Sequence, residues 1–172
     1  PPVPLGRGLS QGCPMSPTLF RLCITHCFNA LTQKWAHKRY GYTLNDGPPI
    51  PAAVYADDIF LLAHKKHHIK NMINDLNRQL SQLGLTITNT SSKTTVTTNN
   101  QAWRNHTLHT DIGNINVHGP ETPLTVLGAK LDMTGAMQPE LQHRRTRALS
   151  AYWGQKQLLQ QKQAPFKRRI QL

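Results

Sequence analysis

Apolar residues recur at helical spacing in two long stretches of the chain. In residues 16–39 they occupy one continuous face, made of Leu19, Phe20, Cys23, Ile24, Cys27, Phe28, Leu31 and Trp35. In the second stretch, which ends at Gly84, the same period is kept by Ile69, Met72, Ile73, Leu76, Leu80 and Leu83. A period of about 3.6 residues places such positions on one side of a helix. The pattern therefore predicts two amphipathic helices.

Shorter apolar runs predict β-strands. Residues 51–56 and 59–63 are apolar runs that flank Asp57 and Asp58, so we expect a hairpin with the two acids at its tip. We also expect single strands at 42–44, 85–88 and 93–98, and a strand pair made of 115–117 and 124–131. From Pro139 onward the pattern is helical again, and it is basic.

The charge balance indicates a polyanionic partner. Lysine and arginine number 20 and acids only 8 among the 172 residues, which gives a net charge of +12. A basic surface gains affinity for nucleic acid because binding releases counterions from the phosphates. No apolar run reaches the roughly 18 residues of a membrane span, and no signal peptide is visible, so we expect no membrane partner. Three cysteines, an odd number, favour free thiols in a reducing intracellular compartment.

The adjacent acids Asp57 and Asp58 are the first candidate for chemistry. Neighbouring carboxylates repel each other, and a bound cation relieves that repulsion. Mg²⁺ binds carboxylate oxygens together with substrate phosphates, and phosphoryl transfer uses two such ions about 3.5–4 Å apart. An ordinary acidic turn is the alternative, because Asp is favoured in turns. The histidines fit no standard zinc spacing.

Four short motifs follow one another along the chain: Gln11 to Phe20 read Q-G-C-P-M-S-P-T-L-F, Tyr55 to Asp58 read Y-A-D-D, residues 83–94 lead to Lys93, and residues 126–131 read V-L-G-A-K-L. With these motifs the sequence resembles a reverse transcriptase of the non-LTR retrotransposon type. Gln11 to Phe20 match that family's Q-G-x-P-x-S-P-x-L-F motif, and Tyr55 to Asp58 match its Y/F-A-D-D hairpin. Residues 83–94 resemble the segment that brings a lysine, here Lys93, to the incoming nucleotide. Residues 126–131 are similar to the primer-grip hairpin. The four motifs occur in the family's order.

The resemblance implies a role for each candidate residue. Asp57 and Asp58 would hold catalytic Mg²⁺, or Mn²⁺ in its place, and Lys93 would protonate or neutralise the departing pyrophosphate. The nucleotide and template would be contacted by Gln11, Gly12, Pro14, Tyr55 and Ala56, the primer end by Leu127 and Gly128, and the duplex backbone by Arg144, Arg145 and Arg147. The glutamine–glycine loop and the acidic turn would face one cleft. An RNA template, a DNA primer and deoxynucleoside triphosphates would be the partners, with the fingers and an endonuclease of the same polyprotein.

For the fold, the resemblance implies an α+β right-hand polymerase palm. An antiparallel sheet with the catalytic hairpin would be backed by two helices in residues 1–133, and a basic helical thumb would begin in 134–172, with the fingers absent. Family members carry a third metal-binding aspartate upstream of the glutamine–glycine motif, and the chain shows no acid in that context. We therefore expect this polypeptide alone to be inactive. Its parent would synthesise DNA on RNA by two-metal nucleotidyl transfer, in the nucleus if the element is eukaryotic.

Two other classes of function stay open. One is a non-catalytic nucleic-acid-binding remnant of a retroelement, which keeps the fold without the chemistry. The other is a group II intron maturase-like protein or an RNA-directed RNA polymerase, since palm folds are shared. Ala56 argues against the RNA polymerases, which usually carry glycine before the two aspartates.

Overall fold

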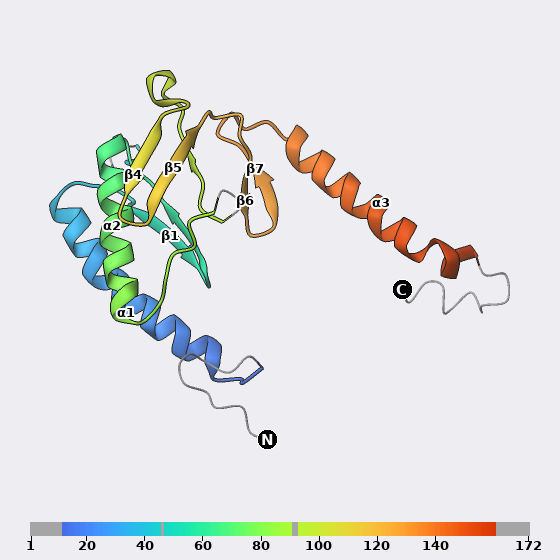
Figure 1. Ribbon diagram of the computed structural model, residues 1–172, viewed down its shortest axis with the longest axis horizontal. Coiled ribbons are helices and arrows are strands. Elements are labelled where there is room, and N and C mark those ends of the chain that lie inside the picture. Colours follow the sequence, from blue (N-terminus) through green and yellow to red (C-terminus); the bar gives the residue numbers. More distant parts are fainter. Residues whose placement is uncertain (1–11, 46, 91–92, 161–172) are drawn as a thin grey trace. The chain divides into compact units, whose positions relative to one another are not determined.

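The chain has a mixed α+β structure that divides into two compact units, residues 1–119 (unit 1) and 120–172 (unit 2) (Figure 1). The computed structural model describes residues 12–45, 47–90 and 93–160. Unit 1 contains, in chain order, α1 (Ser16–His37), β1 (Ala52–Tyr55), β2 (Asp58–Leu61), α2 (Lys66–Gln82), β3 (Val96–Thr97), the 3₁₀ turn η1 (Gln101–Trp103), β4 (Thr107–Thr110) and β5 (Gly113–His118). Unit 2 contains β6 (Leu124–Val126), β7 (Ala129–Leu131) and α3 (Gln138–Gln160). None of the described helices is long and apolar enough to cross a bilayer.

The first core of unit 1 lies between the two predicted helices, and both are confirmed. Its buried members are Ile24, Phe28, Leu31, Trp35, Tyr40, Met72, Leu76 and Leu80. Trp35 and Met72 are fully buried, and the rings of Phe28 and Trp35 meet edge to face with centroids 6.2 Å apart. Burial of one such side chain contributes about 1.5–3 kcal/mol. Packing of this face therefore holds α1 and α2 together.

The apolar face of α1 is buried only from Ile24 onward. Leu19 is 40% exposed and Leu22 is 61% exposed, and Cys23 is exposed as well. At 1.5 Å per residue, the 22 residues of α1 span about 33 Å and the 17 residues of α2 about 26 Å. Because α2 is the shorter helix, it cannot cover the whole apolar face of α1.

The β1–β2 hairpin forms as predicted. Its strands are antiparallel, and Tyr55 pairs with Asp58 across the loop residues Ala56 and Asp57. Successive strand residues point to opposite faces. Ile59 and Leu61 are packed against the first core, so Asp58 and its partner Tyr55 project from the other face of the hairpin.

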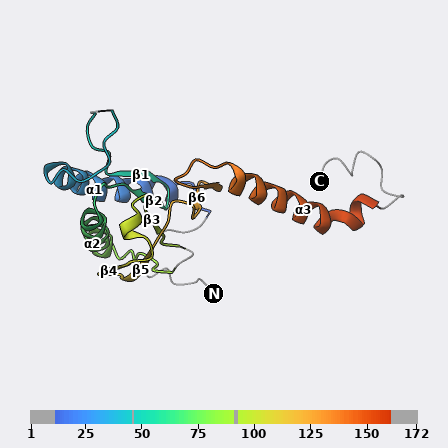
Figure 2. The ribbon, with the colours of Figure 1, turned by 90° about the horizontal axis from the view of Figure 1, so that it is seen from above.

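A second core joins α2 to a three-stranded sheet of order β3-β5-β4. β4 and β5 are antiparallel, whereas β3 runs parallel to β5. The buried members are Ile73, Leu108, Ile115 and Val117. Since Met72 belongs to the first core and Ile73 to the second, α2 packs on two sides. Figure 2 shows α2 between α1 and the β4–β5 pair.

Several strand predictions are wrong, because pairing is not a local property of the sequence. The segment 115–117 does not pair with 124–131: β5 pairs with β4, and 124–131 folds back on itself as β6 and β7. Residues 85–88 form no strand, although Leu85 and Ile87 pack on the first core. Only two residues of 93–98 are in β3, and 42–44 is reduced to a bridge between Tyr42 and Ile50. The described strands form three small sheets in place of one antiparallel sheet.

Unit 2 consists of a hairpin linked to the basic helix α3, which the sequence predicted. β6 and β7 are antiparallel, and the backbone N–H of Lys130 on β7 donates a hydrogen bond to the Glu140 carboxylate on α3. In the connection, the Asp132 carboxylate accepts hydrogen bonds from the N–H groups of Thr134 and Ala136, at 3.0 and 3.1 Å. The expected palm–thumb boundary at 133/134 stays a prediction.

Candidate active site

Asp57 and Asp58 lie at the tip of the β1–β2 hairpin, after a residue with unusual backbone geometry. Ala56 has a φ of 53°, in the left-handed region that non-glycine residues seldom adopt. A positive φ at the first of two loop residues is typical of a type II′ turn, where glycine is usual. The conformation costs about 1–2 kcal/mol for alanine. Strain of this kind is concentrated at functional sites.

Both carboxylates at the hairpin tip are exposed and unpaired. Within the part of the chain that the structure describes, neither Asp57 nor Asp58 has an ion pair or a side-chain hydrogen bond. Four other acids in that part are engaged in structural contacts: Asp75 with Lys34, Asp111 with Arg78, Asp132 with the backbone before α3, and Glu140 with Arg144. In this strongly basic chain, the tip is therefore a free site of concentrated negative charge.

The donor atoms of the hairpin tip suit a hard divalent cation. Asp57 and Asp58 offer carboxylate oxygens, which Mg²⁺ and Mn²⁺ prefer. No group of three His, Cys, Asp or Glu side chains gathers at a metal-binding distance anywhere in the described residues. Two carboxylates do not complete the coordination of such a cation, so an ion held here would need further ligands from water or other groups.

The glutamine–glycine loop is described only in part, because Gln11 lies outside the described residues. Gly12 has a φ of 89°, and nothing lies within 4 Å of where a Cβ would stand. The backbone conformation, rather than crowding, therefore requires glycine at this position. Pro14 is exposed in the turn that leads into α1. A cleft shared by Gln11 and the acidic turn stays a prediction.

Lys93 is exposed on a turn before β3. Its backbone N–H donates to the Thr90 carbonyl at 2.9 Å, and the N–H of Thr94 donates to the same carbonyl at 2.8 Å. The Thr94 hydroxyl also donates to the carbonyl of Thr88 at 2.7 Å. These bonds hold Lys93 and Thr94 close to Thr88 and Thr90. Among the described residues, no hydrogen bond or ion pair joins the Lys93 side chain to Asp57 or Asp58.

In unit 2, the structure brings the expected primer-contacting turn and part of the basic helix together. Leu127 and Gly128 have φ values of 50° and 83°, which is the sign pattern of a type I′ hairpin turn. Leu127 is 57% exposed despite its strained backbone. Arg145 is exposed on α3. One cavity of about 270 Å³ is lined by Gly128, Glu140, His143, Arg144 and Arg147.

Comparison with known proteins identifies the family to which the chain belongs. A family model described as reverse transcriptase (RNA-dependent DNA polymerase) matches residues 2–131, well over half of the chain. The chain belongs to the reverse transcriptase family. The match includes the acidic hairpin, both helices of unit 1 and the Lys93 turn. No curated protein matches the chain. No solved structure matches it either.

The chain also contains a buried acid whose role the sequence did not reveal. Asp75 lies on α2 and is 7% exposed. Its carboxylate is 2.6 Å from Lys34 Nζ and accepts a hydrogen bond from Trp35 Nε1 at 3.2 Å. The only sequence signal is its position between Met72 and Leu76, on the buried side of the helix. Because both partners lie on α1, Asp75 has a structural role.

Proposed function

We propose that this chain contributes part of the catalytic site of a reverse transcriptase of the non-LTR retrotransposon type. The observation that carries the proposal is the pair of exposed, unpaired carboxylates on a strained two-residue turn, in a chain of net charge +12. The substrates would be deoxynucleoside triphosphates, added to a DNA primer on an RNA template. The reaction would be nucleotidyl transfer with two divalent ions.

In this proposal Asp57 and Asp58 bind Mg²⁺, or Mn²⁺ in its place. When bound, such ions neutralise phosphate charge and polarise the reacting oxygens. Tyr55 is 65% exposed on the same face of the hairpin as Asp58, so its ring is available to the template or the nucleotide beside the carboxylates. Ala56 presents only a methyl group there, which leaves room for a nucleotide to approach the turn.

The remaining unit 1 residues would position the nucleotide. Gln11 offers amide donors and an acceptor, and Gly12 and Pro14 shape the loop that carries it. Lys93 would place a positive charge near the departing pyrophosphate. Its exposed side chain, on a residue whose backbone N–H is bonded to Thr90, supports this role.

Unit 2 would contact the primer and the duplex. The exposed Leu127 and Gly128 form a turn that can approach the primer end, and the shared cavity supports joint action of Gly128 with Arg144 and Arg147. Arg145, exposed on the same helix, would add a phosphate contact. Such contacts position a duplex without reading its sequence. In this view residues 1–133 belong to the palm and 134–172 to the start of the thumb.

We further propose that the 172 residues alone do not polymerise. An in-line displacement needs positioning and charge neutralisation together. Asp75 and Asp111, the other described acids of unit 1, are already paired with Lys34 and Arg78. Neither of these two acids is therefore free to act as the third carboxylate of the site.

Primer extension in a fusion protein tests the proposal. The chain is joined behind the upstream half of a related reverse transcriptase, which supplies the third aspartate, and is given Mg²⁺, a DNA primer on an RNA template and deoxynucleotides. We expect extension by the fusion and none by the chain alone. Asp57→Asn should abolish extension, whereas Asp111→Asn, at an acid remote in sequence from the hairpin, should preserve it. A fusion that folds and binds primer–template without extending it would support a non-catalytic remnant; preferential use of ribonucleotides would support an RNA polymerase.

A further inference from the structure

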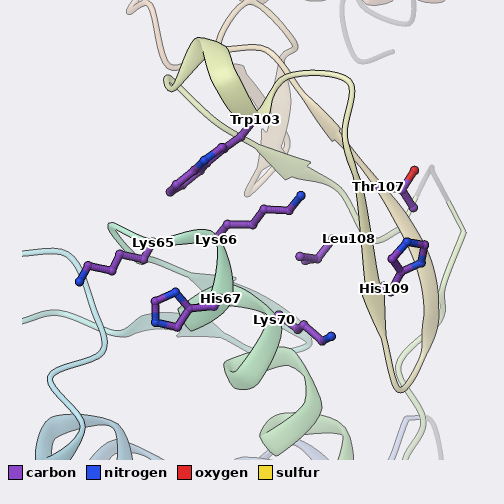
Figure 3. A pocket seen from close by; sticks show the side chains of 8 residues that line it. All are labelled: Lys65, Lys66, His67, Lys70, Trp103, Thr107, Leu108 and His109. Atoms are coloured by element: carbon purple, nitrogen blue, oxygen red, sulfur yellow. The ribbon is translucent and has the colours of Figure 1, made fainter.

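A basic cavity in unit 1 lies at the opposite end of the hairpin from Asp57 and Asp58. β2 runs from the acidic tip at Asp58 to Leu61, and the chain then leads into the first turn of α2. The cavity has a volume of about 590 Å³ and is lined by Lys65, Lys66, His67, Lys70, Trp103, Thr107, Leu108 and His109. Figure 3 shows Trp103, Lys66, Lys70 and Leu108 around one common space. This volume lies within the usual range of ligand sites.

The lining carries positive charge without compensation. It includes three lysines and two histidines and no acid among the described residues. Within the same part of the chain, Lys65, Lys66 and Lys70 have no ion pair. The nearest polar partner of Lys66 Nζ is itself basic, His106 Nδ1 at 3.5 Å. An anion is therefore the ligand that this charge distribution favours.

The spacing of two lysines adds a geometric constraint. Lys66 and Lys70 are four residues apart on α2, which places them on one helical face with Cβ atoms about 5–6 Å apart. Like charges at this spacing, at the positive end of the helix dipole, destabilise a helix. Burial, together with repulsion from His67, Lys65 and His64, lowers the pKa of His68 beside them. Repulsion between these positive groups lowers the stability of the protein without a ligand, and bound phosphates would relieve that repulsion.

An aromatic ring and an apolar wall complete the cavity. Trp103 ends η1, which is fixed because the N–H of Ala102 donates to the Asn100 side chain at 2.9 Å. Leu108 is buried and forms the wall on the β4 side. His109 is held by Asn114, with 2.7 Å between His109 Nδ1 and Asn114 Oδ1. A partly exposed indole beside lysines is the combination on which nucleobases stack while their phosphates are neutralised.

We infer that this cavity, defined by Lys66, Lys70 and Trp103, is a second nucleic-acid site that binds a single strand, with a base on the indole and neighbouring phosphates on the two lysines. A duplex keeps its bases stacked, so only an unpaired base can reach Trp103. A flat anionic membrane fits less well, because the apolar lining is recessed: Leu108 is buried and Trp103 is only partly exposed. The site is independent of catalysis at the hairpin.

Binding of a short unstructured RNA tests the inference on the 172-residue chain. The chain is titrated with a fluorescein-labelled hexanucleotide in EDTA, and anisotropy is measured over a range of salt concentrations. A DNA hexanucleotide of the same sequence and anionic phospholipid vesicles are tested alongside. We expect the double variant Lys66→Gln/Lys70→Gln to weaken RNA binding about tenfold at low salt. Because each phosphate contact on a single strand contributes about 0.7 to the slope of log affinity against log salt, loss of two should lower the slope by about 1.4.

Matched variants separate this site from general charge and from the hairpin. Arg21→Gln/Lys38→Gln removes the same charge from exposed positions on and just after α1, and it should leave the affinity within threefold and the slope unchanged. Because the titration is run in EDTA, any contact that depends on a divalent ion at the hairpin is absent from this comparison. An equal loss in the Arg21/Lys38 variant, or an unchanged slope in the Lys66/Lys70 variant, would overturn the inference. So would binding to vesicles in place of either oligonucleotide.

Tryptophan fluorescence provides a local readout. Trp153 on α3 is 58% exposed, so it is replaced by Phe, while Trp35 is fully buried and gives a constant background. Quenching by the hexanucleotide should then be lost in Trp103→Phe, while the affinity is largely kept because a ring remains. Trp103→Leu should weaken binding about tenfold. An unquenched Trp103, or wild-type affinity in the leucine variant with its fold intact, would show that no base stacks here.

Discussion

The indole Nε1 of Trp35 donates a hydrogen bond of 3.2 Å to the buried carboxylate of Asp75, across the interface between α1 and α2. Lys34, the neighbour of Trp35, is 2.6 Å from the other oxygen of the same carboxylate. The two contacts lie at the edge of the first core, where Trp35 is fully buried. They explain how an acid is accommodated on the inner side of α2.

Removal of Asp75 should strongly destabilise unit 1. Asp75→Ala leaves the buried indole N–H without its acceptor and deprives Lys34 of its partner, so we expect the free energy of unfolding to fall by about 3 kcal/mol. Asp75→Asn, which retains an acceptor, should lose about half as much. Urea unfolding measures both. Asp111→Ala breaks the exposed ion pair with Arg78 and should cost less than about 1 kcal/mol. Equal losses at the two acids would contradict the role given to Asp75.

Substitution of Ala56 by glycine should stabilise the hairpin. Glycine adopts a φ of 53° without the penalty of a Cβ, so Ala56→Gly should raise the free energy of unfolding by about 0.5–1 kcal/mol even after its greater unfolded-state entropy. Ala53→Gly, in the middle of β1, is the matched control, and it should lose about 0.5–1 kcal/mol. Thermal unfolding separates the two, and destabilisation by both would mean that Ala56 is not strained.

The three cysteines should differ in reactivity. Hydrogen bonds from the Met15 backbone and the Ser16 hydroxyl lower the pKa of Cys13, whereas burial, and then the nearby Cys23, raises the pKa of Cys27. Since the thiolate is the reactive form, Cys13 should be alkylated by iodoacetamide at a lower pH than a free cysteine. Cys27 should react only on unfolding.

Mass spectrometry of tryptic peptides across pH 6–9 checks this order. Ser16→Ala should move the Cys13 profile to higher pH and leave the Cys23 profile unchanged. Alkylation of Cys27 in the folded chain at the rate of Cys13 would contradict the burial of Cys27.

Acid should detach the β6–β7 hairpin from α3. The N–H of Lys130, and then the guanidinium of Arg144, hold the pKa of Glu140 below its ordinary value of 4.5. A group with a lowered folded-state pKa contributes stability above its unfolded value and loses it as the pH falls through the folded value. Protection of the Lys130 amide from hydrogen exchange should therefore persist at a pH above the ordinary value of 4.5 and decrease as the pH falls through the lowered pKa of Glu140. NMR exchange measurements follow that amide directly.

Variants of two of the three acids of unit 2 test the assignment. Glu140→Gln should remove most of the pH dependence of Lys130 exchange, because the charge that titrates is gone. Glu121→Gln, at an exposed acid of the same unit, should leave it intact. If the pH dependence of Lys130 exchange were unchanged in the Glu140 variant, this carboxylate would not be the group that joins α3 to the β6–β7 hairpin.

The sequence by itself determined the helices, the acidic hairpin and the family. The helical spacing of apolar residues in α1 and α2 is a local feature of the sequence, and so are the two apolar runs that flank Asp57 and Asp58. Each can be recognised from neighbouring residues alone. The four motifs in order required no structure either. The sequence, however, did not show which acids lack an ion-pair partner. Asp75 is paired with Lys34, 41 residues away, and Asp111 with Arg78, 33 residues away, and neither pairing is visible in the local sequence.

Tertiary structure alone decided the partners of β3, β4 and β5 and the basic cavity. β5 had a recognisable pattern, but its partner β4 came from a polar segment without one, since backbone pairing depends on which strand edge is nearby. Trp103 and Lys66 are 37 positions apart in the chain and became neighbours through the packing of α2 on the β4–β5 sheet. Contacts of this kind arise from the burial of apolar faces, which sets distances that local spacing does not encode.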